Sequence, residues 1–496
     1  MTVRVLIATL FALAMPLAAD QRLGVIEFPN SGGAQAQDHF LTGVLLMHNF
    51  EYDDAAAAFQ RAHEADPSFG MAYWGEALSH YRPVWGREDL SKGRDALAGV
   101  AKAKRLTERE RGYIDAARIV FGEGDKEDRW QRYSDAMEQL YRAHPADLEA
   151  ASFYAVSLFG TTGRVRDTRT YMRIASIAED VYLENPDHPG ALHYLIHSFD
   201  DPVHAPLGLR YARRYSKVAS SAPHAQHMPT HIFLALGMWE ECVSSNIDSW
   251  ESSEARVKRL GLDSDDRGYH ALWWMQYGYL QMGRFDEARQ RLAVVEHDAK
   301  VSGTRLARGH HAYMRSQFLI DTEQWELDLM PVDADGIDAR GWGSNALAEG
   351  MRAIKTGDTA AAERWLARLR DYASEHADRS RSLPIVVLEL EGLLLLEKKP
   401  KAALEKLREA AAMEEKTAFG YGPPFPAKPA FELLGDALLG LDRAEEAAQA
   451  YRSSLDRAPR RALSLMGLRK AAKATGDIAT VARMDAELKG YGEGKS

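Results

Sequence analysis

The sequence is poor in the features that would fix its class at once. It has a single cysteine, Cys242, so no internal disulfide can form and stability must come from burial of apolar surface. Its formal net charge is −10, which argues against general nucleic-acid binding, because such binding needs a basic face. Beyond residue 19 there is no apolar run of the roughly 20 residues needed to span a bilayer. We therefore expect neither a nucleic-acid partner nor a transmembrane segment.

Several catalytic signatures are also missing. The sequence contains no Walker-type phosphate loop, no dinucleotide-binding fingerprint after a strand and no Gly-x-Ser-x-Gly nucleophile elbow. Cys242 falls at a small-residue position of a predicted helix, which indicates a packing role. The sequence therefore assigns no catalytic residue and leaves open whether the protein is an enzyme.

What the sequence does contain begins with its first 19 residues. The stretch "MTVRVLIATLFALAMPLAA" has an arginine near its start, a short apolar run and small residues at its end. This order is typical of a cleavable secretory signal peptide. We expect cleavage after Ala19 and a periplasmic or secreted mature protein.

The rest of the chain is dominated by a helical repeat. In "FEYDDAAAAFQRAHEADPS" and in "LLGLDRAEEAAQAYRSSLDRAP", small residues, an aromatic residue and a closing proline follow one another at helical spacing. The residues in these places are Ala55, Phe59, Ala62 and Pro67 in the first stretch, and Ala447, Tyr451, Ser454 and Pro459 in the second. Small residues suit close helix contacts, and proline ends a helix because it cannot continue one. This pattern resembles the tetratricopeptide repeat family.

The resemblance implies an all-α fold, a right-handed α-solenoid of roughly ten helical hairpins without strands. Equivalent small residues recur about every 40 positions, longer than the 34 of a standard tetratricopeptide repeat, and armadillo-like repeats are an alternative at this period. The expected organisation is a signal peptide (1–19), N-terminal repeats (20–160), central histidine-rich repeats (161–300) and C-terminal repeats (301–496).

Histidines are concentrated in the central repeats. "HYLIH" contributes His193 and His197, and "HAQHMPTH" contributes His224, His227 and His231. Histidines four residues apart on a helix lie on one face, about one turn apart, where both can bind one metal ion. The tetratricopeptide register places the last three, and also His270, on the concave groove. We predict a transition-metal site formed by four of these residues, His193, His197, His227 and His231, with His224 and His270 as weaker candidates.

Other residues could add to this site. Glu76 and His80 are four residues apart at groove positions of an earlier repeat, and His48 takes a groove position in the first repeat. These three are weaker candidate ligands, because the superhelix would have to bring a distant repeat across. Nearby carboxylates either orient imidazoles from outside the ligand shell or serve as turn and capping residues, and the second role is expected for most of them. They are Asp200, Asp201, Asp263, Asp265 and Asp266. Pro229, between His227 and His231, predicts either a helix that begins there or a kinked helix.

Two further segments could contribute to binding. The aromatic stretch "YHALWWMQYGY" places Trp273 and Tyr277 on the groove and assigns Trp274 to packing. The proline-rich segment 420–431, "GYGPPFPAKPAF", interrupts the helical rhythm and predicts a stiff loop that either closes one end of the groove or spaces two repeats.

Taken together, the motifs "HYLIH" and "HMPTHIF" resemble those of a group of exported bacterial tetratricopeptide proteins. The resemblance implies a fold and a histidine pattern and no reaction. We predict an exported solenoid whose groove binds a transition metal (copper, zinc or iron), or a peptide, protein or small molecule. The alternatives are a metalloenzyme that activates water or oxygen at the histidines, and a protein-interaction scaffold without metal.

Overall fold

A computed structural model describes residues 22–163, 166–376 and 382–492. The predicted signal peptide therefore lies outside the described residues. The N-terminal half contains α1 Ala34–His48, α2 Tyr52–Ala65, α3 Gly70–Leu78, α4 Leu90–Ala98, α5 Glu108–Val120, α6 Lys126–Ala143, α7 Leu148–Gly160, α8 Thr168–Glu184, α9 Pro189–Ser198, α10 Ala205–Val218, α11 Pro223–His227 and α12 Pro229–Ala235.

The C-terminal half contains α13 Trp239–Leu260, α14 Tyr269–Gln281, α15 Phe285–Val301, α16 Arg305–Thr322, α17 Ala339–Lys355, α18 Thr359–Glu375, α19 Leu383–Leu395, α20 Pro400–Glu415, α21 Ala430–Gly440, α22 Ala444–Arg457, α23 Ala462–Thr475 and α24 Ile478–Glu487. Three short 3-10 helices, Pro83–Trp85, Gly99–Lys102 and Ser264–Asp266, complete the helical elements. Among the described residues, none of the helices is both long and apolar enough to cross a membrane.

Several helices begin or end where the sequence provides a cap. Thr107 and Glu110 form a reciprocal capping box at the start of α5. Aspartates such as Asp147 and Asp358 accept a backbone N–H at the N-terminus of α7 and α18. α13 ends at Gly261, whose φ of 65° is the left-handed conformation that glycine adopts at helix ends.

Consecutive helices form antiparallel hairpins that stack on one another. Phe59 of α2 shows the packing rule, because its ring fills the space beside Gly43 of α1 and Gly75 of α3. Tyr451 of α22 lies in the same way between Gly435 of α21 and Gly467 of α23. An added Cβ at Gly75 or Gly467 would lie 2.3 or 2.2 Å from the aromatic ring. The prediction of an all-α solenoid of tetratricopeptide type is confirmed.

The expectation of no strands is wrong in one detail. Tyr81–Arg82 (β1) and Arg87–Glu88 (β2) pair antiparallel after α3. Pro83 at the first turn of the intervening 3-10 helix prevents α3 from continuing, and the chain returns through Gly86 in the left-handed conformation.

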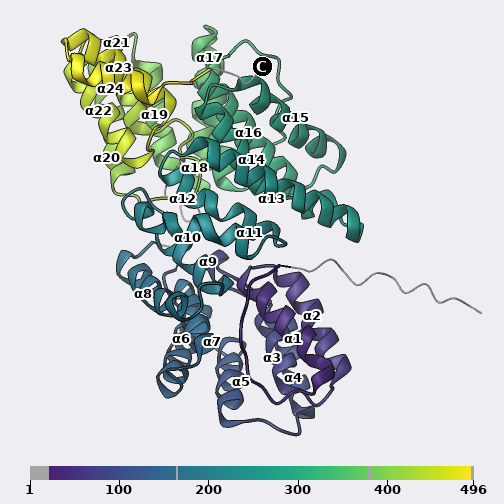
Figure 1. Cartoon of the computed structure of the whole chain (residues 1–496). Coiled ribbons are helices and arrows are strands. Elements are labelled where there is room, and N and C mark those ends of the chain that lie inside the picture. The colour runs from purple at the N-terminus through teal and green to yellow at the C-terminus, as the bar shows by residue number, and fades with distance from the viewer. Residues whose placement is uncertain (1–21, 164–165, 377–381, 493–496) are drawn as a thin grey trace, which may run out of the picture.

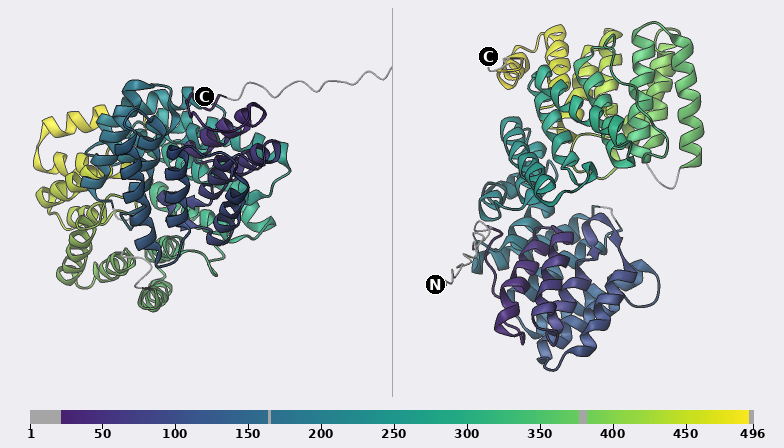
Figure 2. Two further views of the ribbon diagram at one scale, coloured as in Figure 1. Left: turned by 90° about the horizontal axis from the view of Figure 1, so that it is seen from below. Right: turned by 90° about the vertical axis from the view of Figure 1, so that its right-hand side faces the viewer.

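The hairpins form two lobes, with α9–α12 between the N-terminal and the C-terminal helices (Figures 1 and 2). One buried apolar core runs from Leu23 to Cys242, a second from Trp239 to Ala427 and a third from Ile385 to Met484. The N-terminal lobe curves so strongly that α1 contacts α9. The end of the first repeat therefore reaches the central histidines.

Candidate metal centre

Six histidines from three consecutive first helices meet at the junction of the two lobes. They are His193 and His197 of α9, His224 and His227 of α11, His231 of α12 and His270 of α14. The helix is broken at Met228, which ends α11 and precedes Pro229 at the first position of α12. Met228 keeps helical angles, φ −54° and ψ −36°, so His227 and His231 still face the same side. Both predictions for Pro229 hold in part, because α12 begins at Pro229 and yet follows α11 with a single residue between them, as in a kinked helix.

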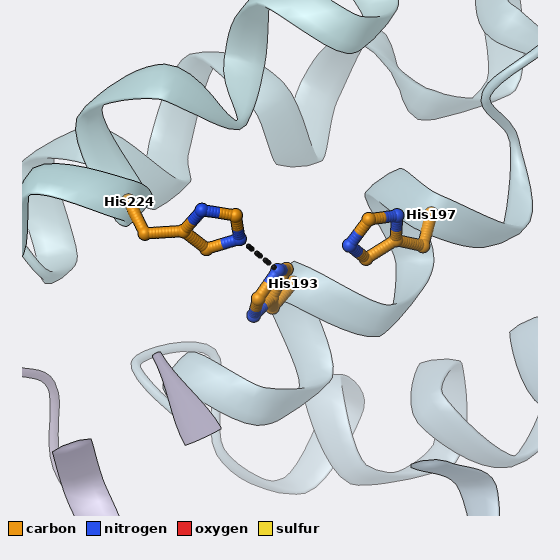
Figure 3. A group of neighbouring side chains, drawn as sticks. All are labelled: His193, His197 and His224. Carbon is orange, nitrogen blue, oxygen red and sulfur yellow. Dashed lines mark hydrogen bonds between the residues drawn. The ribbon is translucent and has the colours of Figure 1, made fainter. Parts of the chain in front are cut away.

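The first three of these histidines form one group, which we call triad A: His193, His197 and His224. Figure 3 shows His193 and His197 on one helix and His224 reaching toward them from another. The Nε2 atoms of His193 and His224 are 3.2 Å apart. One nitrogen from each of the three rings lies within 4.8 Å of the others, so a single ion could contact all three.

The other three form triad B: His227, His231 and His270. Their ligand nitrogens also lie within 4.8 Å of one another. The ring centroids of His227 and His270 are 4.7 Å apart, and those of His227 and His231 are 5.1 Å apart. The triads adjoin, since the His197 and His231 centroids are separated by 5.4 Å.

Hydrogen bonds from outside the cluster fix the tautomers of three of these rings. The partners are acceptors: the carbonyl oxygen of His48 for Nδ1 of His193 (2.8 Å), the amide oxygen of Asn246 for Nδ1 of His227 (2.7 Å) and the carboxylate of Asp200 for Nδ1 of His231. Each Nδ1 must therefore carry the proton, which leaves the lone pair on Nε2. Metal-binding histidines are commonly oriented in this way.

The cluster contains nitrogens without a protein partner. His197 is 4% exposed, yet neither of its ring nitrogens makes a hydrogen bond, and Nε2 of His227 is also unpartnered. A buried polar atom without a partner is costly.

Burial lowers the pKa of His193, His197 and His224 well below the usual value for histidine, and neighbouring imidazoles lower it further. Burial, then His231, lowers the pKa of His227 to about 3. These imidazoles are neutral at pH 7, as metal ligands must be.

Aromatic side chains form the walls. The ring of Phe50 lies 4.0 Å from that of His193, between centroids, and Trp274 lies 4.5 Å from His231 and 4.9 Å from His227. Phe50 has a φ of 59°, a left-handed conformation that is rare for a bulky residue. It places the ring of the first repeat over the histidines of the fifth hairpin. Such strain is typically found at functional positions.

The proline-rich segment reaches this site from the C-terminal lobe. Tyr421 lies 6.0 Å from His231 and 6.1 Å from His197, between ring centroids, and its hydroxyl is 2.6 Å from that of Tyr171. Gly422, with a φ of 83°, lies so close to Trp274 that an added Cβ would be 2.4 Å from the indole. Of the two interpretations of this loop, the structure shows closure over the histidines.

One side of the cluster stays open to solvent. His224 is half-buried, His270 is exposed and the neighbouring Trp85 is 38% exposed. An ion bound to either triad would therefore have three protein ligands and a route to solvent, which is the arrangement of catalytic rather than structural metal sites.

His48 belongs to a different group. It is buried with Glu149 and His188, and Nε2 of His48 is 2.7 Å from the Glu149 carboxylate. Nε2 of His188 is 3.1 Å from the other carboxylate oxygen. The remaining Nδ1 atoms accept the Tyr194 hydroxyl (2.8 Å) and the Ala191 N–H (3.1 Å). Every ring nitrogen of this His48–Glu149–His188 group has a partner, which indicates a structural role.

The other predicted residues lie apart from the two triads. Glu76 accepts from His63 (2.9 Å) and Gln60 (2.8 Å), and His80 lies near Lys92 and Asp89. Among the described residues, neither joins a triad. The curvature of the superhelix brings the end of α1 to the histidines of α9. Glu76 and His80 lie on and just after α3, which does not reach the triads, so the prediction that they could add ligands is wrong.

The aromatic residues of α14 divide differently from the prediction. Trp273 stacks on Tyr313 with ring centroids 4.8 Å apart, whereas Trp274, assigned to packing from the sequence, lies against triad B. Tyr277 is buried and lines a cleft of about 1140 Å³. No histidine of the triads lines this cleft, but Asp200 and Gly422 do. The cleft and the cluster therefore share a wall.

Sequence reasoning missed four contributors, Phe50, Asn246, Trp274 and Tyr421. Phe50 comes from a distant repeat, and nothing local connects it to the histidines. Tyr421 belongs to the proline-rich segment that was expected to close one end of the groove or to space two repeats, but the residue itself was not singled out. Asn246 lies on the turn of α13 that faces α11. An asparagine on the apolar face of an amphipathic helix was the one feature of the sequence that could have pointed to it.

No model of a known protein family matches the sequence, and no curated protein matches it. Among solved structures, the chain is similar to the human IFIT1 dimer with PPP-AAAA (12% identity over 92% of this chain and 90% of that one, TM-score 0.38). It is also similar to yeast Tom70 (11%, 92% and 99%, TM-score 0.31) and to the P58(IPK) TPR domain (15%, 90% and 99%, TM-score 0.23). The tetratricopeptide-type assignment itself stands on the hairpins described above.

Proposed function

We propose that this protein is an exported tetratricopeptide-type solenoid that binds a transition metal at its central histidines. The observation that carries the proposal is the set of outer hydrogen bonds. Three Nδ1–H groups are held by acceptors, and the Nε2 lone pairs that remain belong to rings packed against one another. Nε2 of His193 pairs only with Nε2 of His224, and Nε2 of His227 and both nitrogens of His197 have no partner. In the His48–Glu149–His188 group, by contrast, every ring nitrogen is hydrogen-bonded to a group that is not a histidine.

The donor set supports copper or zinc. Imidazole suits zinc, copper, iron and nickel, but non-haem iron sites usually add a carboxylate to two histidines. Triads A and B consist of imidazoles alone. The likeness of the first 19 residues to a signal peptide supports a periplasmic or secreted location, where such metals are acquired.

A second candidate function is metal-assisted catalysis. It is favoured by the 1140 Å³ cleft, which meets the cluster at Asp200 and is large enough for a small organic ligand or part of a peptide. Because each triad supplies three ligands, a bound ion would keep a position for water or substrate. If the protein binds no metal, the groove and cleft remain as a site for a protein or peptide partner.

The test is the metal content of the protein exported to the periplasm and purified without a His tag or chelator. We expect at least one equivalent of copper, zinc or iron, and N-terminal sequencing should begin after Ala19. The double variant His193→Ala, His231→Ala should lose the metal and keep its helical circular dichroism. A matched control is His144→Ala, His297→Ala, which removes two histidines that belong to neither triad and should keep the metal.

Two results would contradict the proposal. The first is a wild-type protein that stays metal-free after incubation with each of the three metals. The second is full metal content in the double variant, which would place the ion elsewhere.

A further inference from the structure

We infer that the histidine cluster holds two transition-metal ions, one in each triad, as a binuclear centre. This inference rests on the proposed function, since it concerns the same cluster. The inference goes beyond the proposed function in the number of ions, in their separate ligand sets and in the chemistry that a pair of ions allows.

The two triads occupy equivalent positions in successive repeats. His193 and His197 of α9 are followed 34 residues later by His227 and His231, and both pairs begin four residues after a proline that starts the helix, Pro189 or Pro223. A period of 34 is that of the standard tetratricopeptide repeat. One hairpin step along the solenoid therefore maps one HxxxH pair onto the next.

The third ligand follows the same step. His224 is the second residue of α11, and His270 is the second residue of α14. In each triad the HxxxH pair of one first helix is completed by the second residue of the next first helix. At the next step, the positions of the HxxxH pair are taken by Trp273 and Tyr277. The repeated histidine pattern therefore forms two triads, and the next repeat has no HxxxH pair to form a third.

The spacing within triad A suits one ion. Metal–imidazole bonds of 2.0–2.1 Å at tetrahedral angles place two nitrogens about 3.3 Å apart. The Nε2 atoms of His193 and His224 are 3.2 Å apart, and neither triad contains ligand atoms more than 4.8 Å apart. His197, buried with both nitrogens unpartnered, is beside them. The ligands need only small movements to bind.

Both triads have their own outer support. The His48 carbonyl orients His193 of triad A, and Asn246 and Asp200 orient two rings of triad B. The sites are adjacent, because the His224 and His227 ring centroids are 6.3 Å apart and those of His197 and His231 are 5.4 Å apart. Two ions this close could hold one small ligand between them, as two-metal sites do.

One alternative on the same side chains is a single ion shared between the triads. His197, Asp200 and His231 also bring ligand atoms within 4.8 Å of one another. Asp200 already accepts a hydrogen bond from Nδ1–H of His231, which is the role that carboxylates commonly take beside a metal-binding histidine. We therefore assign Asp200 to orienting His231.

The experiment counts ions in full-length mature protein. Metal-free protein is loaded with Zn²⁺, or with Cu⁺ under anaerobic conditions, then desalted and analysed for metal. The single variants are His224→Ala for triad A and His270→Ala for triad B. Since His224 is half-buried and His270 exposed, neither should disturb folding, which circular dichroism checks. We expect two equivalents in the wild type, one in each single variant and none in the double variant.

Each other result has a distinct meaning. One equivalent in the wild type would overturn the binuclear centre and leave the proposed metal binding intact, whereas none would overturn both. Two equivalents in His224→Ala would also overturn the inference, because the ions would then lie outside the triads. Electron paramagnetic resonance of the Cu²⁺-loaded wild type gives an independent readout. We expect a spin-coupled pair, and two isolated copper signals would count against it.

Discussion

Two buried histidine groups lie side by side in this protein and differ in one respect. In the His48–Glu149–His188 group, every ring nitrogen and both carboxylate oxygens have partners. In the two triads, outer acceptors hold three rings while other nitrogens, including both of His197, have none. Four of the six triad histidines are as buried as the members of that group, so burial alone does not separate the triads from it. The difference lies in how many ring nitrogens are hydrogen-bonded.

The largest expected effect on stability comes from disrupting the fully hydrogen-bonded His48–Glu149–His188 group. Glu149→Ala removes the carboxylate that accepts hydrogen bonds from Nε2 of both His48 and His188. Because Nδ1 of His188 accepts the Ala191 N–H, its Nε2 must remain a donor and is left without an acceptor. Removing one partner of a buried charged network typically costs about 3–5 kcal/mol. We expect a large fall in the thermal unfolding midpoint, with unchanged metal content in the protein that remains folded.

The matched variant is His197→Gln in triad A. Because His197 makes no hydrogen bond, the metal-free protein should unfold near the wild-type temperature, and metal binding should be lost. Equal destabilisation by both variants would remove the distinction between the groups.

The next effect is the pH dependence of the metal-free protein. His193, His197, His224 and His227 have lowered pKa values in the folded state. The unfolded chain therefore binds more protons below pH 6.5, and stability falls as the pH drops from about 7 toward 4. The carboxyl of Glu51, whose pKa burial raises to about 7, acts in the opposite direction between pH 7 and 4.5.

Other groups act in each direction: the pKa is also lowered for His48, His80, His270, His310 and His311, and raised for the buried carboxyls Asp321, Glu389 and Glu414. Because these imidazoles outnumber these carboxyls, we expect the midpoint of thermal unfolding to fall with acidification. His227→Gln should flatten this dependence, and the exposed control His297→Gln should leave it as in the wild type. A wild-type midpoint that rises between pH 7 and 5 would show that the buried carboxyls dominate.

The smallest effect concerns Asn246. Asn246→Ala removes the acceptor that holds Nδ1–H of His227. Loss of such an outer partner typically weakens metal binding 10- to 100-fold, which a competition titration with a chromophoric chelator would measure. Asn345→Ala, at another buried asparagine on α17, is the control and should keep wild-type affinity. An unchanged metal affinity in the Asn246 variant would mean that packing alone orients His227.

The sequence was sufficient for the fold and for the histidine pattern. Small residues, aromatics and closing prolines at helical spacing are local signals, and a hairpin repeat follows from them. The HxxxH pairs are local as well, so four candidate ligands could be named in advance. Of the five weaker candidates, His224 and His270 join the triads, and His48, Glu76 and His80 do not. The triads themselves could not be predicted, since they depend on how each first helix meets the next.

The remaining parts of the site depend on long-range geometry. Phe50 reaches the histidines because the N-terminal lobe curves until α1 contacts α9, and the sequence gives no measure of that curvature. The same curvature leaves Glu76 with His63 instead of a metal. Asp200 was one of several aspartates that the sequence offered for orienting an imidazole, whereas Asn246 is an ordinary polar residue in the sequence. Only the structure shows that both accept from rings of triad B.

The loop that carries Tyr421 has a consequence for the order of assembly. All six histidines are in place once α14 has been made, but Tyr421 arrives from the far end of the chain, after six further helices have been formed. A nascent or partly folded chain would thus present an uncovered set of ligands. Metal could enter from the side that is later closed by Tyr421, and the C-terminal lobe would then act as the last step of loading.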